Sequence, residues 1–428
     1  MVSFKLFILF SLILSAALYF RIKFFKLNIE FTNRKNKSQF VDLNGIVHFH
    51  TVYSDGSGRI QDLIETAGKL KADFLISSDH NTLKPKEDGI EGYYACRDGS
   101  VAGGGVEGEA CLLYFAGEEI NTEFGHLLAI GIEKEIKRGK YKEVLSEIKK
   151  QKGASVICHP HNWWTPWKNL DVEGYDVIEI INLDSQWRGM NPLYMLAVIF
   201  SYRINSFYAL HFLSHKPVKT IKFWDGAQKH KFMKTGIAST DAHSNVKVTK
   251  KRRFKFPKYS ELFSVARTHI LLENKLSGNL TEDKKKITEA VRRGRCYFSF
   301  DLYGFPKGFY YYIDWGGEHY FSGDSVPCNM DKKDKNVIIY AGIDINPKKT
   351  PFIINLFKNG IKVFSSKSRD MVYEIVLEDL KSGFVSEVEP IAAAAGIFRS
   401  SFYRIEIDVY FGRKKITYLY SNNIEIYM

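Results

Sequence analysis

A short apolar run that ends in histidine, or in aspartate and histidine, occurs four times in this chain and limits how it can fold. The four stretches are GIVHFH (residues 45–50), DFLISSDH (73–80), ASVICHPH (154–161) and GIASTDAH (236–243). Runs of this length and composition are typical of buried strands. Strands that all end in ligand-type side chains predict one shared site at the carboxyl edge of a sheet.

The first of these strands offers two histidines to one site. Side chains alternate faces along a strand, so His48 and His50, one residue apart, point the same way and can hold one cation between them. Asp55 follows in the polar turn TVYSDGSG, where the buried strand opens into a loop.

Two adjacent acids lie between the second and third of these strands. The apolar run at 111–116 is followed by Glu118 and Glu119, and a polar turn then leads to His126. A carboxylate can bridge two divalent ions, because each of its oxygens can take one ion. On this reasoning either Glu118 or Glu119 could be the bridge.

Helical patterns alternate with the strands. Apolar residues at helical spacing predict helices over 60–70, 141–150 and 284–293. Strands that alternate with helices predict an α/β fold with a parallel, barrel-like sheet. Residues 183–235, rich in aromatic side chains and histidine, break this rhythm and predict either an insertion that roofs the site or an aromatic core patch.

Six motifs in a fixed order carry a family resemblance: HFHTVYSDGSG, ISSDHNT, GEEINTEFGHLLAIGI, CHPH, STDAH and RRGRCYFS. Together they resemble the PHP (polymerase and histidinol phosphatase) superfamily of metal-dependent hydrolases, and within it the branch related to carbaryl hydrolase. The match spans about residues 43 to 300. The resemblance implies a distorted seven-stranded (β/α) barrel.

The resemblance also implies a set of ligands for each of three metal ions. The first ion would take His48, His50, Glu119 and Asp241, the second Glu119, His126 and His159, and the third Asp55, His80 and His243. Glu119 rather than Glu118 matches the family pattern. Asp79 would orient an imidazole from behind the ligands. His161 is a further candidate for catalysis.

Histidine and carboxylate ligands suit two or three zinc, manganese or iron ions. Adjacent divalent ions lower the pKa of a shared water, so hydroxide can attack an ester without a serine or cysteine nucleophile. We therefore expect Glu119, Asp241 and His161 to serve catalysis. The sequence contains no GxSxG, P-loop or CxxC motif. Strand alternation predicts that Cys158 is a buried core thiol facing away from His159.

These residues predict a hydrolase that cleaves a phosphoester with metal-activated water. A hydrolase of carboxylic or carbamate esters, and a catalytically silent metal-binding scaffold, remain as alternatives. The formal net charge of +13 suits an anionic small-molecule ester. Trp163, Trp164 and Arg188 are candidates for its pocket, or for core and rim.

The basic charge has a local maximum in KVTKKRRFKFPK, residues 247–258. Such a run is expected to be a solvated loop, or else a contact for anionic lipid headgroups or an anionic substrate. No recognition motif accompanies it, so nucleic acid is not expected as a partner.

The N-terminus has the pattern of a membrane anchor or export signal. Residues 6–20 are apolar except for two serines, and Arg21, Lys23 and Lys26 follow. The basic cluster favours an uncleaved anchor over residues 1–26. We therefore expect a membrane-anchored or exported protein of the cell envelope, with the side that it faces left open.

The remaining domain boundaries follow from changes in pattern. Residues 27–42 are expected to be a linker, 43–303 the PHP metallohydrolase domain and 304–428 an antiparallel β-sandwich, because apolar and polar residues alternate there. Asn359-Gly360 predicts a hairpin turn within the sandwich. Five cysteines without tight spacing do not indicate a disulfide framework.

Overall fold

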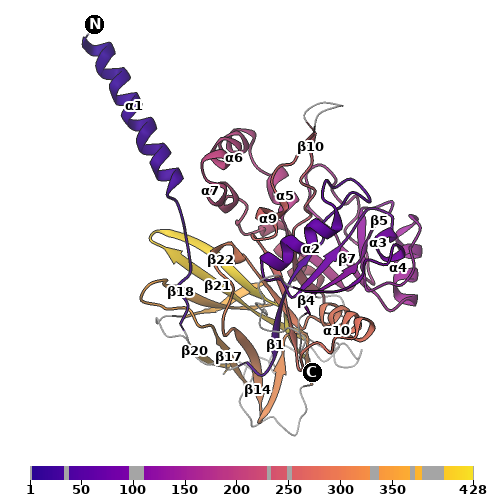
Figure 1. Cartoon of the computed structure of the whole chain (residues 1–428). Coiled ribbons are helices and arrows are strands. Elements are labelled where there is room, and N and C mark those ends of the chain that lie inside the picture. Colours follow the sequence, from indigo (N-terminus) through magenta and orange to yellow (C-terminus); the bar gives the residue numbers. More distant parts are fainter. Residues whose placement is uncertain are drawn as a thin grey trace.

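The protein is a mixed α/β structure with two large sheets (Figure 1). A computed structural model of the chain describes residues 2–32, 38–95, 110–228, 233–247, 253–327, 337–366, 372–377 and 400–427. Parts of the predicted basic loop at 247–258 and of the linker at 27–42 lie outside the described residues. Cys96 and Cys328 lie outside them as well.

The largest sheet joins strands from the beginning of the chain to strands from its end. Its order is β16 (Ser325–Pro327), β23 (Ile424–Tyr427), β21 (Ser400–Phe411), β22 (Lys414–Ser421), β13 (Cys296–Ser299), β12 (Arg267–Leu272), β1 (Val41–Val47), β2 (Phe74–Ser77), β4 (Ala110–Ala116) and β3 (Gly92–Ala95). Two further strands, β18 (Phe352–Lys358) and β19 (Ile361–Ser365), extend it beside β21. Strands β1, β2 and β4 are parallel, so their carboxyl ends lie at one edge.

The second sheet carries the other half of the site. Its order is β5 (Glu118–Asn121), β6 (His126–Ile130), β7 (Ala154–Ile157), β8 (Val177–Asn182) and β9 (Thr235–Ser239). Strands β7, β8 and β9 are parallel. Val47 and Ile76 from the first sheet share a buried apolar core with Leu128 and Val156 from the second, so the two sheets face each other across that core.

The two sheets meet only at short seams, and the described residues form no closed sheet. Backbone hydrogen bonds join His50 N to Ala242 O and Asp241 N to His48 O, while one isolated bridge pairs His80 with Glu119. His48 and Asp241 have positive φ angles there, of 58° and 48°, which lie outside the β region that regular strand pairing requires. The expected seven-stranded barrel is therefore not confirmed.

Nine α-helices follow the first strand in the described part of the chain, and three of them lie where periodicity predicts a helix. They are α2 (Ile60–Lys69), α3 (Lys84–Glu87), α4 (Tyr141–Lys150), α5 (Leu183–Arg188), α6 (Pro192–Ile204), α7 (Ser206–His211), α8 (Val218–Ala227), α9 (Tyr259–Leu262) and α10 (Leu280–Arg293). The three predicted helices are confirmed as α2, α4 and α10. Helix α10 begins at a side-chain cap, in which Asn279 accepts from the backbone of Glu282, and ends at Gly294 with φ of 79°.

The C-terminal strands are mostly antiparallel, as their alternation predicts. A four-stranded sheet contains β15 (Glu318–Phe321), β14 (Tyr310–Trp315), β17 (Val337–Gly342) and β20 (Val372–Leu377), in that order. It packs on β21 through a common core, and the Tyr311 hydroxyl donates to the carbonyl of Tyr403. The hairpin at Asn359-Gly360 is confirmed, with φ of 51° and 81° joining β18 to β19.

One sheet runs across the predicted domain boundary at residue 303. Strand β22 pairs antiparallel with β13, which places Tyr297 opposite Ser421 and Ser299 opposite Leu419. The division into domains stays a prediction. A separate two-stranded ribbon, β10 (Val246–Lys247) with β11 (Arg253–Phe254), lies in the region of the basic loop.

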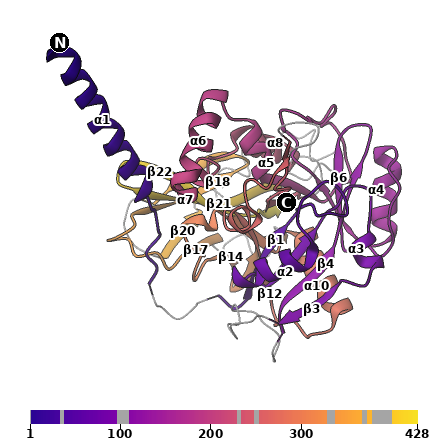
Figure 2. The same ribbon diagram turned by 45° about the horizontal axis from the view of Figure 1, so that its top comes forward.

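The N-terminal residues form helix α1 (Val2–Lys23), which projects away from the rest of the molecule (Figures 1 and 2). Its end is fixed by Asn205, whose amide donates to the carbonyls of Ile22 and Phe25 at 2.9 and 2.8 Å. Within the described residues, no helix has the length and apolarity that a membrane crossing needs. The membrane anchor expected over residues 1–26 stays a prediction.

A buried polar cluster lies between β1, β12 and β13. His269 lies 3.3 Å from Asp42 and 3.2 Å from Asp301, and the Ser299 hydroxyl is 3.2 Å from its Nε2. The cluster contains the residue types of a hydrolytic triad, but His269 is 2% exposed and Ser299 fully buried, so a substrate cannot reach them. Its role is to tie these strands together. Burial lowers the pKa of His269, but Asp301 and Asp42 outweigh it and raise the value from 6.5 to about 10.

We expect His269→Gln to lower the free energy of unfolding by roughly 3–5 kcal/mol at pH 7, because it leaves the buried Asp301 carboxylate without its charged partner. A histidine whose pKa is raised on folding makes its full contribution to the stability of the folded state when the pH is below its pKa in the unfolded chain. That contribution is lost as the pH rises through its pKa in the folded protein. Urea unfolding should therefore show wild-type stability falling between about pH 6.5 and pH 10, with a smaller fall in the variant. His319→Gln, at a half-exposed position on β15, is the control. Equal slopes in all three proteins would contradict the role given to His269.

Candidate metal centre

The structure brings together all nine side chains that the sequence suggests as metal ligands. They come from strand ends on both sheets: His48, His50 and Asp55 after β1, His80 after β2, Glu119 on β5, His126 on β6, His159 after β7, and Asp241 and His243 after β9. The carboxyl ends of β1, β2, β7 and β9 converge here, so chain segments far apart in sequence supply one site.

The first group, buried throughout, consists of His48, His50, Glu119 and Asp241, whose ligand atoms lie within 4.8 Å of one another. Glu119 Oε2 is 3.2 Å from His48 Nε2 and 3.0 Å from His50 Nε2. Asp241 Oδ1 lies 3.5 Å and 3.3 Å from the same two nitrogens. This is the same set of residues that the family resemblance implies for the first ion.

The other oxygen of Glu119 faces a second group of histidines. Glu119 Oε1 is 2.8 Å from His126 Nδ1 and 3.0 Å from His159 Nε2. His80 Nδ1 lies 3.3 Å from Oε2. Glu119 thus has a different set of nitrogens at each oxygen, which is the arrangement of a bridging carboxylate.

A third group lies on the open side of the site. Asp55 Oδ1 is 3.2 Å from His243 Nε2, 3.7 Å from His50 Nδ1 and 4.0 Å from His80 Nε2. The Asp55 side chain is 50% exposed, whereas Glu119 is 1% exposed. Of the three groups, this one therefore has the freest access to solvent.

The backbone is strained at three of these residues. His48, His159 and Asp241 have φ angles of 58°, 32° and 48°, in the left-handed region that residues other than glycine rarely adopt. Such a conformation costs on the order of 1–3 kcal/mol per residue and persists only where the surroundings impose it. The strain turns each side chain out of its strand direction and toward the common centre.

Charge in the site is concentrated and buried. Burial raises the pKa of Glu119, but His48, His80 and His126 outweigh it and hold that pKa well below its usual value. Burial lowers the pKa of His50, but Asp241 and Glu119 raise it to about 10. The carboxylates are thus held as anions and need positive charge beside them. Imidazole nitrogens and carboxylate oxygens at these spacings fit divalent ions such as zinc, manganese or iron.

A tenth residue, Glu179 on β8, was missed by sequence reasoning. Its carboxylate accepts from the backbone N–H of His159 at 2.8 Å and from Asn182 at 2.9 Å, and it also contacts His48 Nδ1. A carboxylate on the far nitrogen of a ligating histidine fixes the ring and its tautomer. The signal was present in the sequence, since Glu179 is the only acid in the apolar strand VIEIIN.

The structure separates the two adjacent acids. Glu119 lies at the centre of the site, while Glu118 points to the opposite face of β5, where it accepts from the backbone N–H of Ile136 at 2.9 Å. Burial raises the pKa of Glu118 to about 8. Strand alternation accounts for this difference between neighbours.

Among the described residues, neither Asp79 nor His161 belongs to the groups of candidate ligands. Asp79 does not orient a ligand imidazole but accepts hydrogen bonds from Thr51 and Ser54, which holds the turn after His50 in place. His161 is outside the groups of candidate ligands found among the described residues, and its Nδ1 lies 3.2 Å from the Thr220 hydroxyl.

Cys158 is buried, as expected, and its Sγ lies within 4.8 Å of ligand atoms of His48 and Glu179. Burial raises the pKa of its thiol well above the ordinary value. A neutral, enclosed thiol is a poor nucleophile.

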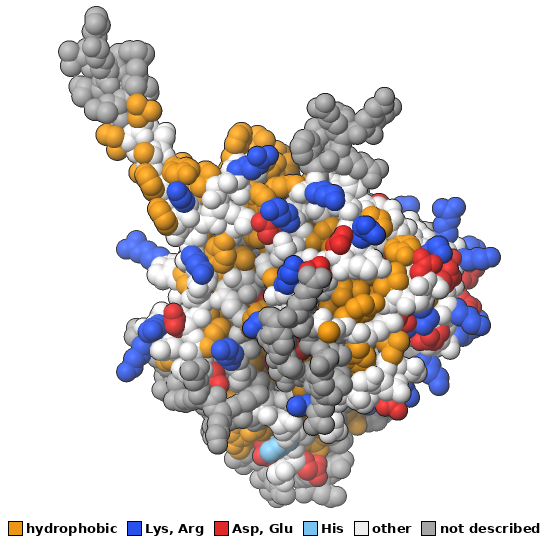
Figure 3. All heavy atoms as spheres, viewed as in Figure 1, with side chains coloured by type: hydrophobic (Ala, Val, Ile, Leu, Met, Phe, Trp, Pro, Cys, Tyr) orange, Lys and Arg blue, Asp and Glu red, His pale blue; other side chains and the backbone are white. Residues whose placement is uncertain are grey.

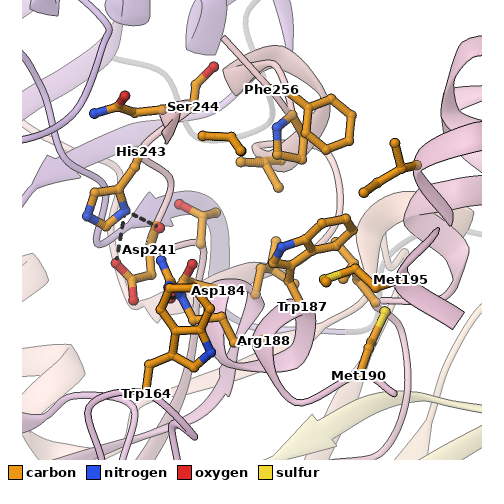
Figure 4. A pocket seen from close by; sticks show the side chains of 18 of the residues that line it. Trp164, Asp184, Trp187, Arg188, Met190, Met195, Asp241, His243, Ser244 and Phe256 are labelled. Atoms are coloured by element: carbon orange, nitrogen blue, oxygen red, sulfur yellow. Dashed lines mark hydrogen bonds and ion pairs between the residues drawn. The ribbon is translucent and has the colours of Figure 1, made fainter. Parts of the chain in front are cut away.

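A pocket of about 800 Å³ opens beside the third group, with which it shares Asp55 and His243. It also shares Asp241 with the first group. Figure 4 shows Trp187, Met190 and Met195 on the side opposite His243. Trp164 and Arg188 also line the pocket, and the guanidinium lies over the indole ring at 4.3 Å while pairing with Asp184. The segment 183–235 supplies α5 and α6, so part of the expected insertion does form a wall of the site.

Comparison with known proteins gives a weak likeness. No family model matches the chain. No curated protein matches it. Among solved structures, a two-domain protein of Bacteroides vulgatus, described as containing a predicted PHP-like metal-dependent phosphoesterase, shares 15% identity, covering 82% of this chain and 90% of that one with a TM-score of 0.33. PsfC from Pseudomonas syringae shares 13% identity over 61% of this chain and 93% of its own, with a TM-score of 0.34.

At such identities and TM-scores these likenesses carry no argument about activity, so any assignment depends on the residues of the site itself. The carbaryl-hydrolase branch is not confirmed by these neighbours and stays a prediction.

The adjacent acids provide a direct test of the centre. We expect Glu119→Gln to lose at least one bound metal ion per chain. The substitution removes the negative charge of Glu119, whose carboxylate lies between the first two groups of the described ligand residues. Glu118→Gln is the matched control and should keep the wild-type metal content, because its side chain faces away. Elemental analysis of the two purified variants measures the difference. Equal metal contents would refute the central place of Glu119.

Glu179 should act on affinity rather than on the number of ions. Glu179→Gln is expected to weaken metal binding by about 10–100-fold while leaving the number of ions bound at saturation unchanged, because the ligands stay but His48 loses its orienting anion. Competition with a chelator measures the affinity. Glu173→Gln, at an exposed position just before β8, is the control. Unchanged affinity in Glu179→Gln would contradict this role.

Proposed function

We propose that the protein is a metal-dependent hydrolase that cleaves a phosphoester with water. The observation that carries the proposal is the convergence of six histidines and two aspartates around Glu119, beside a pocket large enough for a small molecule. Divalent ions held by these residues would lower the pKa of a water molecule and neutralise charge on the reacting ester.

The charge balance supports an anionic substrate. The ligand set contributes three carboxylates, Asp55, Glu119 and Asp241. Three divalent ions would exceed this charge even with Glu179 added behind them, and an excess of positive charge favours a phosphate over a neutral ester. Arg188 adds a guanidinium at the pocket wall.

The residues of the chain have separable tasks. Glu119 keeps the two inner groups at a fixed separation, because one side chain serves both. Asp241 and His243 belong to the ligand set and also line the pocket, so they are the groups that face the substrate and the attacking water. His243 Nδ1 lies 2.9 Å from the backbone carbonyl of Asp241, which orients its ring (Figure 4). We assign no role in this reaction to His161.

A carboxylic or carbamate ester is the second candidate. Trp187, Met190 and Met195 give the pocket an apolar side, which suits the aryl group of such a substrate. A silent metal-binding scaffold has no need for a pocket of this size next to its metal ligands.

We expect the metal-loaded protein to hydrolyse 4-nitrophenyl phosphate mono- or diesters faster than 4-nitrophenyl acetate or an aryl carbamate. Asp241→Ala should lower kcat/KM by at least about 100-fold, because it removes a ligand and a group facing the substrate. Release of 4-nitrophenol measures each rate, and chelation followed by readdition of metal is the control. Retained turnover in Asp241→Ala, or after chelation, would reject the proposal, while faster carbamate cleavage would favour the second candidate.

A further inference from the structure

The pocket beside the metal groups has two chemically different ends. At one end Asp55, Asp241 and His243 belong to the candidate ligand set. The other end is formed by an apolar wall, which we define as Trp187, Met190, Met195, Ile199 and Phe256. A ligand that fills both ends must itself be polar at one end and apolar at the other.

The apolar wall is built from two helices and an opposing loop. Trp187 lies on α5, Met195 and Ile199 are one helical turn apart on the inner side of α6, and Phe256 stacks edge-on against Trp187 at 5.9 Å between ring centroids. Methionine and aromatic side chains accommodate flexible chains because they adapt in shape and carry large apolar area. The wall therefore suits a long hydrocarbon group better than a polar one.

The outer side of the same helix is also apolar and open. Leu193, Tyr194 and Phe200 on α6 are 77%, 63% and 73% exposed. Figure 3 shows hydrophobic surface over α6 and at the base of α1, which contact each other. The part of an apolar chain that extends beyond the pocket mouth would therefore meet the exposed apolar face of α6.

From this geometry we infer that the substrate is an amphiphile, an anionic ester whose long apolar chain lies along α5 and α6 while its phosphate faces the metal groups. The inference rests on the proposed function and adds the substrate class. The cavity volume of about 800 Å³ lies toward the upper end of the roughly 300–1,000 Å³ usual for small-molecule sites, so it has room for both parts. The balance is that of hydrolysis: water supplies the oxygen of the new P–O bond, the ester P–O bond breaks, and the leaving alkoxide takes the proton.

The first experiment measures binding without turnover. Isothermal titration of the metal-loaded full chain with methylphosphonate and with octylphosphonate, both monomeric in solution, compares ligands that share one headgroup. Burying one methylene contributes a factor of about three to four in affinity, so partial burial of the octyl chain should tighten binding at least about 30-fold. Equal affinities would overturn the inference.

Variants of the apolar wall locate the chain. Met195→Asp and Ile199→Asp should each reduce the octyl-to-methyl affinity ratio by at least about tenfold, because each places a charge where the chain lies. Ile361→Asp, at a 70% exposed position on β19 outside the pocket, is the matched control and should keep the wild-type ratio. Using two wall variants guards against a folding defect in one of them. If the wall variants keep the wild-type ratio, the chain does not lie there and the inference fails.

The second experiment separates this inference from the proposed function. Rates with 4-nitrophenyl methyl, butyl and octyl phosphate should rise with chain length in the wild type. If no diester is cleaved but octylphosphonate binds at least 30-fold more tightly through the wall, the amphiphile site stands and the phosphoesterase proposal falls. If all diesters are cleaved at one rate and both phosphonates bind alike, the phosphoesterase stands and the amphiphile inference is overturned.

Discussion

The rest of the structure depends on one buried anion. Glu119 is 1% exposed, and burying a carboxylate is costly unless positive charge and hydrogen-bond donors surround it. Its neighbours come from β1, β2, β6 and β7, so both sheets must bring their strand ends to the same point. The backbone departs from the strand conformation at the centre of the site, where His48, His159 and Asp241 have positive φ angles. The break in pairing that keeps the sheets from closing is thus a direct consequence of forming the site.

Much of this could be predicted from the sequence because the relevant signals are local. The period of the apolar residues is enough to place α2 and α4, and Asn359-Gly360 determines its hairpin through the backbone angles it favours. His48 and His50 share a face because strand geometry alone requires it. In each case the conformational preference is set by interactions within a few residues and does not depend on the rest of the fold.

The parts that could not be predicted depend on distant contacts. Glu179 looks like an isolated acid in an apolar strand until folding places His48 beside it. Asp79 sits next to a ligand in sequence, yet its hydrogen bonds go to a different turn. The choice between Glu118 and Glu119 followed from family pattern, and strand pairing of β5 with β6 supplies its physical reason, because only one of two neighbours can face the site.

The pairing of β13 with β22 has a consequence for how this molecule can be divided or recombined. A polypeptide ending after residue 303 would leave the outer edge of β13 with unpaired backbone groups, which is a template for aggregation. The ligand-bearing half can therefore exchange its C-terminal module only for one that supplies an edge strand in the same register. Such a dependence would make the C-terminal sheet an integral part of this folding unit and not a detachable accessory.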